Sequence, residues 1–191
     1  PGLPRALLFD VFGTVVDWRS SIAREVQAAL ASHSASVDSE AFADRWRALY
    51  QPAMSRVRSG KIEFVPLDKL HRENLDQVLA EFSVDHLSES EKVQLNLAWH
   101  KLDAWPDAAA GLERLKSRYI IGTLSNGNIA LIVNMAKYAG LPWDVVLGAE
   151  VARAYKPQPQ AYLGSAQALG LTPAECMLVA AHNDDLKAAA Q

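Results

Sequence analysis

Ala6-Leu7-Leu8-Phe9-Asp10-Val11-Phe12-Gly13-Thr14 is an apolar run that ends on a carboxylate and continues into a glycine turn. Four apolar residues in succession are typical of a short buried strand, which we expect over residues 5–10. Gly13 allows a sharp turn because glycine accepts backbone angles that a side chain forbids. In parallel α/β sheets, ligands and chemistry lie beyond the carboxyl ends of the strands. Asp10 is therefore predicted to be a nucleophile or a metal ligand.

The bulk composition limits the classes of function. The chain has 191 residues, half of them hydrophobic and 21% charged, as in a globular enzyme with one core or one core plus a smaller helical module. A net charge of −3 gives no electrostatic reason to expect nucleic acid or an anionic membrane as partner. No segment has the roughly 20 apolar residues that span a bilayer, and no signal-peptide core is seen. These features predict a cytoplasmic protein without a membrane segment.

A long helical pattern follows the first strand. Apolar residues recur at helical spacing after the capping pair Ser20-Ser21, and the sequence from Ser88 to Glu91 resembles a capping box. Helices are predicted over about 20–30, 39–58, 67–79 and 88–100. Because no strand pattern interrupts this block, residues 17–100 are predicted to form a compact helical insert.

After Pro106, short apolar strands alternate with helices. Helices are predicted at 108–116, 129–138 and 161–169, and strands at 119–124, 145–147 and 176–180. Such alternation is typical of a doubly wound parallel sheet. The predicted fold class is α/β, with a core made of residues 1–16 and 101–191 and a helical cap of residues 17–100. Residues 185–191 are expected to be helical, and a further strand is expected to complete the sheet edge.

Four short motifs follow predicted strands in order along the chain. They are Asp10 to Thr14, Ser125-Asn126, Lys156-Pro157 and the segment 179–185. Each motif alone is common in turns and loops. Together they resemble the four motifs of the haloacid dehalogenase superfamily, and they span most of the chain outside the helical insert. This resemblance implies a Rossmann-like core with an inserted cap domain.

Phe12 distinguishes this chain from the phosphatase branch of that superfamily, which carries a second aspartate at this position. A phenylalanine can neither protonate a leaving group nor hold a metal. Magnesium prefers several hard oxygen ligands, yet the earlier acid position of the fourth motif is Ala181. Only Asp10 and either Asp185 or Asp184 remain as ligands. The residues therefore favour a site without metal or cofactor.

Within the superfamily, the motifs look most like those of the type II L-2-haloacid dehalogenases. That resemblance implies back-side attack by Asp10 on the halogen-bearing carbon, followed by hydrolysis of the resulting ester by water. An L-2-haloacid would become a D-2-hydroxy acid, the partners would be a small 2-halocarboxylate and water, and the enzyme would be a homodimer. An ionised Asp10 needs a nearby cation, and Lys156 is the candidate.

The resemblance also assigns roles to the other motif residues. Asp185 would hold Lys156 in place, and Thr14 would orient Asp10. Ser125 would bind the substrate carboxylate together with the backbone amides of Val11 and Phe12. Asn126 would lie near the departing halide.

Three further residues extend the expected site. Arg47, in Arg45-Trp46-Arg47, would reach the halide or the carboxylate, and Tyr162 either lines the pocket or packs in the core. His182 replaces an asparagine of the well-known members, and Asp184 stands where those members carry an aromatic residue. His182 could bind a small halide, position the hydrolytic water, or only bond a loop carbonyl.

Two other functions are compatible with the same fold. One is a magnesium-dependent phosphohydrolase, which would need a general acid that the sequence does not provide. The other is a catalytically silent member that binds a small carboxylate. A dehalogenase assay with a chelator separates the first from the main prediction, and the Asp10→Asn variant separates the second.

Overall fold

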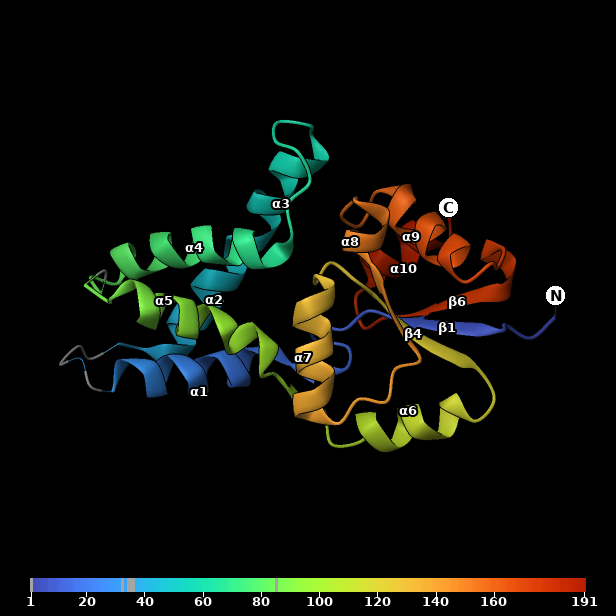
Figure 1. The fold of residues 1–191 in the computed structure, drawn as a ribbon, viewed down its shortest axis with the longest axis horizontal. Coiled ribbons are helices and arrows are strands. Elements are labelled where there is room, and N and C mark those ends of the chain that lie inside the picture. Colours follow the sequence, from blue (N-terminus) through green and yellow to red (C-terminus); the bar gives the residue numbers. More distant parts are fainter. Residues whose placement is uncertain (1, 32, 34–36, 85) are drawn as a thin grey trace.

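The computed structural model describes residues 2–31, 33, 37–84 and 86–191. Figure 1 shows a group of helices at one end of the molecule and a sheet with helices on its faces at the other. The two parts meet where the strands end, so residues from both can surround one cavity.

The sheet has four parallel strands in the order β5-β4-β1-β6. Their bounds are β1 Ala6–Phe9, β4 Ile120–Ser125, β5 Val145–Gly148 and β6 Cys176–Val179. In the central strand β1 every residue is buried, as its apolar run predicted. Phe9 is in register with Thr123 on one side and Val179 on the other. The ends of three strands therefore lie level, and Asp10 follows directly.

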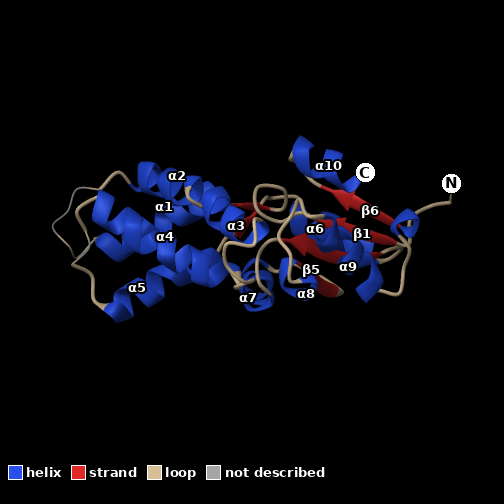
Figure 2. Cartoon of the chain, turned by 90° about the horizontal axis from the view of Figure 1, so that it is seen from above, coloured by secondary structure: helices blue, strands red, loops and turns tan. Residues whose placement is uncertain are grey.

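Helices cover both faces of the sheet (Figures 1 and 2). On one face lie α6 Ala108–Lys116 and α7 Ile129–Ala139. On the other lie α8 Ala149–Ala152, α9 Pro159–Ala168 and α10 Asn183–Ala189, with a 3₁₀ turn at Pro173–Glu175 before β6. This arrangement confirms the predicted doubly wound α/β fold.

In the described residues, the helical part has five helices and one 3₁₀ segment. They are α1 Trp18–Leu30, α2 Ser39–Ala48, α3 Tyr50–Arg58, α4 Leu67–Glu81, α5 Glu89–Asn96 and the 3₁₀ turn Leu97–His100. Their apolar faces meet around Trp46 and Trp99, which are fully buried with ring centroids 5.4 Å apart. Ser88 and Glu91 form the predicted capping box. None of the helices in the described ranges is long and apolar enough to cross a bilayer.

The single helix predicted over 39–58 is in fact two. Helix α2 ends at Ala48, and α3 begins at Tyr50. Pro52 explains the break, because it lacks the N–H that would bond the Ala48 carbonyl and its ring would crowd that carbonyl. The two helices therefore change direction at Leu49, which brings α3 towards the sheet (Figure 1).

A two-stranded ribbon, which the sequence pattern did not predict, joins the two parts. Strand β2, Val16–Asp17, pairs antiparallel with β3, Asp103–Ala104. The chain thus leaves and re-enters the α/β part at adjacent points. Asp17 also accepts the N–H of Ser20 and so caps α1.

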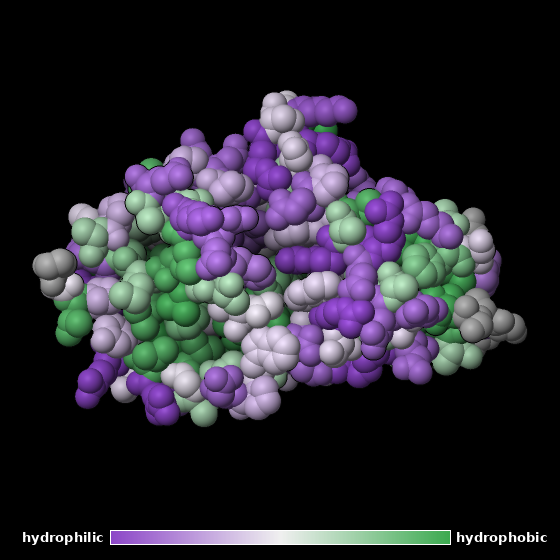
Figure 3. All heavy atoms as spheres, turned by 180° about the vertical axis from the view of Figure 1, so that it is seen from behind, coloured by the Kyte–Doolittle hydropathy of each residue, from purple (hydrophilic) through white to green (hydrophobic). Residues whose placement is uncertain are grey.

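Strand β6 lies at the edge of the sheet and has β1 as its one strand partner among the described residues. Met177 of this strand is 50% exposed. Figure 3 shows hydrophobic residues gathered on the back of the α/β part of the molecule.

Candidate active site

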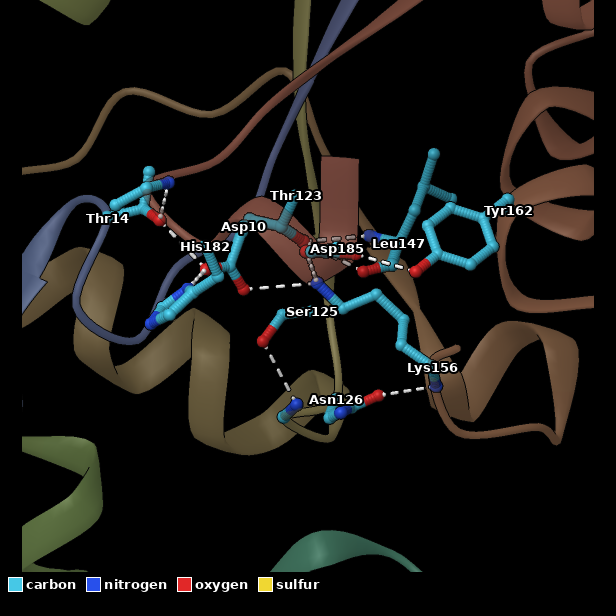
Figure 4. Close-up of polar contacts among 12 residues, drawn as sticks. Asp10, Thr14, Thr123, Ser125, Asn126, Leu147, Lys156, Tyr162, His182 and Asp185 are labelled. Carbon is cyan, nitrogen blue, oxygen red and sulfur yellow. Dashed lines mark hydrogen bonds and ion pairs between the residues drawn. The ribbon is translucent and has the colours of Figure 1, made fainter. Parts of the chain in front are cut away.

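Polar side chains from four strand ends converge at one edge of the sheet (Figure 4). Asp10 follows β1, Asn126 follows β4, Lys156 lies in the loop after α8, and Asp185 lies on α10 after β6. A cavity of about 620 Å³ lies over them. Residues of α2 and α3 also line this cavity, so the sheet and the helical part enclose it together.

Lys156 links the two carboxylates of the site. Its ammonium nitrogen is 3.1 Å from Oδ1 of Asp10 and 2.5 Å from Oδ2 of Asp185. The hydroxyl of Tyr162 donates to the other oxygen of Asp185, at 2.6 Å. Asp10 and Lys156 are only 7% and 8% exposed. A buried cation thus lies between two carboxylates.

The surroundings keep the central pair charged. Burial alone would raise the pKa of Asp10, but the charge of Lys156 and hydrogen bonds from Thr14, Lys156 and His182 outweigh it. The pKa of Asp10 is therefore lower than that of a free aspartate. Burial would also lower the pKa of Lys156, whereas the charges of Asp10 and Asp185 raise it above its ordinary value. Asp10 is thus ionised and Lys156 protonated over a wide pH range.

Thr14 and His182 contact the same oxygen of Asp10. The Thr14 hydroxyl donates to Oδ2 at 2.8 Å, and Nδ1 of His182 lies 2.9 Å from it. The N–H of Ala181 donates to the Thr14 oxygen, which directs the hydroxyl hydrogen towards Asp10. The His182 side chain is 52% exposed and lines the cavity. The predicted orienting role of Thr14 is consistent with this geometry.

The motif at the end of β4 splits into a buried and a cavity-facing residue. Asn126 lines the cavity, and its side-chain oxygen accepts the backbone N–H of Lys156 at 2.8 Å. Ser125 is fully buried, and its hydroxyl accepts the N–H of Gly127. Neither Ser125 nor Val11 is among the residues that line the cavity. Because the Ser125 hydroxyl is the acceptor in this bond, it could donate its own hydrogen to a substrate carboxylate without leaving Gly127.

Gly148 permits the close approach of β5 to β4 at Ser125. Its φ is +128°, and a Cβ there would lie 2.1 Å from the Ser125 carbonyl oxygen. Only glycine fits this position, so the last residue of β5 helps to fix the loop that carries Asn126.

Arg47 lies in an aromatic cradle made of Tyr50, Phe12 and Trp18. The carbon of its guanidinium is 4.0 Å from the ring centroid of Tyr50 and 5.4 Å from those of Phe12 and Trp18. Its Nη1 is buried and has no hydrogen-bond partner among the described residues. Arg47 also lines the cavity, so its positive charge lies beside this space.

Three cavity residues, Tyr50, Gln51 and Arg58, were missed by the sequence interpretation. Arg58 donates to the carbonyl oxygen of Lys156 at 3.2 Å and so ties α3 to the lysine loop. Gln51 and Arg58 are seven residues apart on α3, which places them on one face of that helix. That spacing could have indicated a polar face directed at the site.

The residues at the site do not match the carboxylate set that magnesium prefers. Phe12 is buried, and its ring meets that of Trp99 edge-on at 6.0 Å. The side chain of Asp184 is 99% exposed and pairs with Lys187 at 3.6 Å. Within the described ranges, no three His, Cys, Asp or Glu side chains are grouped so that they could hold a metal. A metal-free reaction stays a prediction that a chelator can test.

Comparison with known proteins gives a consistent picture. The sequence model of the haloacid dehalogenase-like hydrolases matches residues 4–191. The (S)-2-haloacid dehalogenase 4A of Burkholderia cepacia is 33% identical over 187 residues, which cover 95% of this chain and 77% of that protein.

Crystal structures with the same fold include two L-2-haloacid dehalogenases. The defluorinating enzyme Rha0230 has a TM-score of 0.96 at 57% identity, over 97% of this chain and 77% of that chain. The enzyme of Xanthobacter autotrophicus with chloropropionic acid covalently bound has a TM-score of 0.85 at 26% identity, over 98% of this chain and 74% of that chain. With these relatives and a family model matched from residue 4 to residue 191, the chain belongs to the haloacid dehalogenase-like hydrolases.

Proposed function

We propose that this protein hydrolyses short L-2-haloacids to D-2-hydroxy acids through an ester on Asp10, without a metal ion. The observation that carries the proposal is the buried pair of Asp10 and Lys156, 3.1 Å apart at the end of β1, with Phe12 in place of a second acid. A desolvated, ionised carboxylate is a good nucleophile towards carbon.

In the first step, an oxygen of Asp10 attacks the halogen-bearing carbon while the halide leaves on the opposite side. Arg47, held by its aromatic cradle, and Asn126 contact the departing halide or the substrate carboxylate. The same residues fix the substrate relative to Asp10, and positioning of this kind lowers the barrier of a two-body reaction.

In the second step, water attacks the carboxyl carbon of the Asp10 ester. The bond between this carbon and the ester oxygen breaks, and the hydroxy acid leaves with that oxygen. Lys156 donates to Oδ1 of Asp10, so this oxygen has a cation beside it when its bond to the carboxyl carbon breaks.

Two relatives support the finer parts of the proposal. The Xanthobacter autotrophicus enzyme carries covalently bound chloropropionic acid, which is consistent with an ester intermediate. Rha0230, at 57% identity, is a defluorinating enzyme. We extend the proposal to fluoroacetate, because the unpartnered Nη1 of Arg47 is a donor suited to a small, strongly hydrated halide.

The alternative functions have weaker support. A phosphohydrolase would need a second carboxylate where Phe12 lies, and Asp184 points to solvent. A silent binding protein would not need Asp10 and Lys156 to be buried and charged together. Residues 17–100 are proposed to act as the cap over the site, and the homodimer and the cytoplasmic location stay predictions.

The first experiment measures halide release from L- and D-2-chloropropionate and from fluoroacetate, with and without excess EDTA. We expect halide release from the L isomer and from fluoroacetate. EDTA should leave this release unchanged, and Asp10→Asn should abolish it. Magnesium-dependent cleavage of a phosphate ester without halide release would overturn the proposal. Single turnover in ¹⁸O-labelled water should place the label in Asp10, because water attacks the carboxyl carbon.

A further inference from the structure

The two oxygens of Asp10 differ in the number of donors that they accept. Oδ2 accepts the Thr14 hydroxyl at 2.8 Å and contacts Nδ1 of His182 at 2.9 Å. Oδ1 accepts only the ammonium of Lys156 among the described residues, at 3.1 Å. A carboxylate oxygen has two lone-pair sites. Both sites of Oδ2 are therefore occupied, whereas one site of Oδ1 is open.

This difference distinguishes the oxygen that attacks from the oxygen that stays. Attack by Oδ2 would first require it to lose Thr14 or His182, whereas Oδ1 can attack with its open lone pair. In the resulting ester, Oδ1 joins the carboxyl carbon to the substrate carbon and Oδ2 becomes the carbonyl oxygen. The two donors on Oδ2 then hold the atom on which negative charge develops when water adds.

We infer that His182 is a catalytic residue of ester hydrolysis and that it forms, with Thr14, a two-donor oxyanion site for Oδ2 of Asp10. This inference rests on the proposed dehalogenase reaction. An ionised carboxylate only accepts hydrogen bonds, so Nδ1 of His182 carries the hydrogen in this contact. Donors within about 2.7–3.1 Å of an oxyanion are the geometry that stabilises a tetrahedral intermediate.

The same geometry excludes the halide as the ligand of Nδ1. In back-side displacement, the nucleophilic oxygen and the leaving halide lie on opposite sides of the reacting carbon. Nδ1 of His182 is bonded to the nucleophilic carboxylate itself. Of the two chemical roles that the sequence left open for His182, the one in the hydrolytic half of the reaction is therefore favoured.

The ring of His182 is held in this position by the turn after Asp10. Gly13 has a φ of +83°, and a Cβ there would lie 3.3 Å from Cε1 and 3.4 Å from Nε2 of His182. The ring thus packs over the backbone of the glycine turn. The indole N–H of Trp105 donates to the Gly13 carbonyl at 3.2 Å, which fixes that turn from the other side of the chain.

The atoms balance in this scheme. Oδ1 forms a bond to carbon, and the halide leaves with the electron pair of the broken bond. Water then adds to the carboxyl carbon, and the charge moves to Oδ2 between Thr14 and His182. When the intermediate collapses, the bond to Oδ1 breaks and Oδ1 leaves as the hydroxyl of the product. One water proton ends on that hydroxyl, and the other is released as Asp10 returns to its carboxylate.

Rapid-quench kinetics with L-2-chloropropionate test this role. Halide is measured as a burst and in the steady state, and intact-protein mass spectrometry follows the covalent adduct. For His182→Ala we expect a burst near one halide per site, an adduct that accumulates, and steady-state turnover lowered by about 10²–10³-fold. His182→Asn keeps a side-chain donor and should recover at least tenfold of that loss. Lys187→Ala, on the helix α10 that begins directly after His182, should match wild type.

Two results would overturn the inference. One is unchanged turnover in His182→Ala. The other is a halide burst in His182→Ala that is slowed as much as steady-state turnover, without an accumulated adduct. His182 would then act in the first step. Thermal unfolding of each variant separates these results from misfolding. If wild type itself releases no halide from either L-2-chloropropionate or fluoroacetate, the proposed function has failed, which is a different outcome from a change confined to His182 variants.

Discussion

Asp68 and Asn128 form two hydrogen bonds with each other. The side-chain amide of Asn128 donates to Oδ2 of Asp68 at 2.8 Å, and the backbone N–H of Asp68 donates to Oδ1 of Asn128 at 3.1 Å. His100 contacts the second carboxylate oxygen of Asp68 at 3.0 Å. Asp68 lies on α4 of the helical part, whereas Asn128 directly precedes α7 and follows the loop of Asn126. The pair therefore joins the helical part to the loop that lines the active site.

We expect Asp68→Ala to lower the free energy of unfolding by about 2–3 kcal/mol, because it leaves the buried side chains of His100 and Asn128 without their partner. It should also raise KM for the haloacid, since the Asn126 loop loses its anchor on α4. The matched control is Asp76→Ala on the same helix, where an exposed ion pair with Arg72 is worth at most about 1 kcal/mol. Urea denaturation and initial rates check both variants, and equal losses would contradict the role of the pair.

The sequence allowed the four motifs to be placed at one edge of the sheet, because each follows a parallel strand. The carboxyl ends of parallel strands lie at the same edge. The sequence could not reveal that His182 contacts Asp10, because the two residues lie far apart in the chain. Their contact depends on the turn at Gly13, over which the His182 ring packs. The ribbon of β2 and β3 was missed because strands of two residues carry no periodic pattern.

The network of Asp68, His100 and Asn128 was missed for a related reason. Helix α4 shows an apolar periodicity that predicts its existence, but its buried face also carries His71 and Asn74. Polar residues on a buried helical face indicate a polar interface, yet they do not identify the partner on another element. The break at Pro52, by contrast, was available from the sequence, because proline inside a predicted helix is a known interruption.

Lys156 neutralises two buried carboxylates, so its removal should affect both stability and chemistry. We expect Lys156→Met to cost about 3–5 kcal/mol of stability at neutral pH, because Asp10 and Asp185 are left without their cation. The pKa of Asp10 should rise, and the halide burst should fall by at least about 10³-fold at pH 7. Lys187→Met, at an exposed position, is the control. A stable Lys156→Met variant with a normal burst would contradict this account.

The pH dependence of the burst follows from the two shifted pKa values. The pKa of Asp10 is lowered, so its ionised form is lost only as pH falls below the ordinary range of aspartate, near pH 4. The pKa of Lys156 is raised, so its charge is lost only above the ordinary value of lysine, near pH 10. By linkage, the stability that each contributes is lost in the same directions. We expect a flat burst rate from about pH 5 to pH 9, and a midpoint inside this window would refute the assignment.

Arg47 should not be replaceable by lysine. Its planar guanidinium stacks on Tyr50 and has a buried, unpartnered nitrogen, whereas an ammonium is a compact, strongly hydrated charge. We expect Arg47→Lys to lower kcat/KM by about 10- to 30-fold, which corresponds to about 1.4–2 kcal/mol of lost binding. Arg45 lies on the same helix as Arg47 and forms an exposed ion pair with Glu81 of α4. Arg45→Lys should therefore stay within twofold of wild type. Similar losses in both variants would mean that the loss at Arg47 does not come from its aromatic cradle.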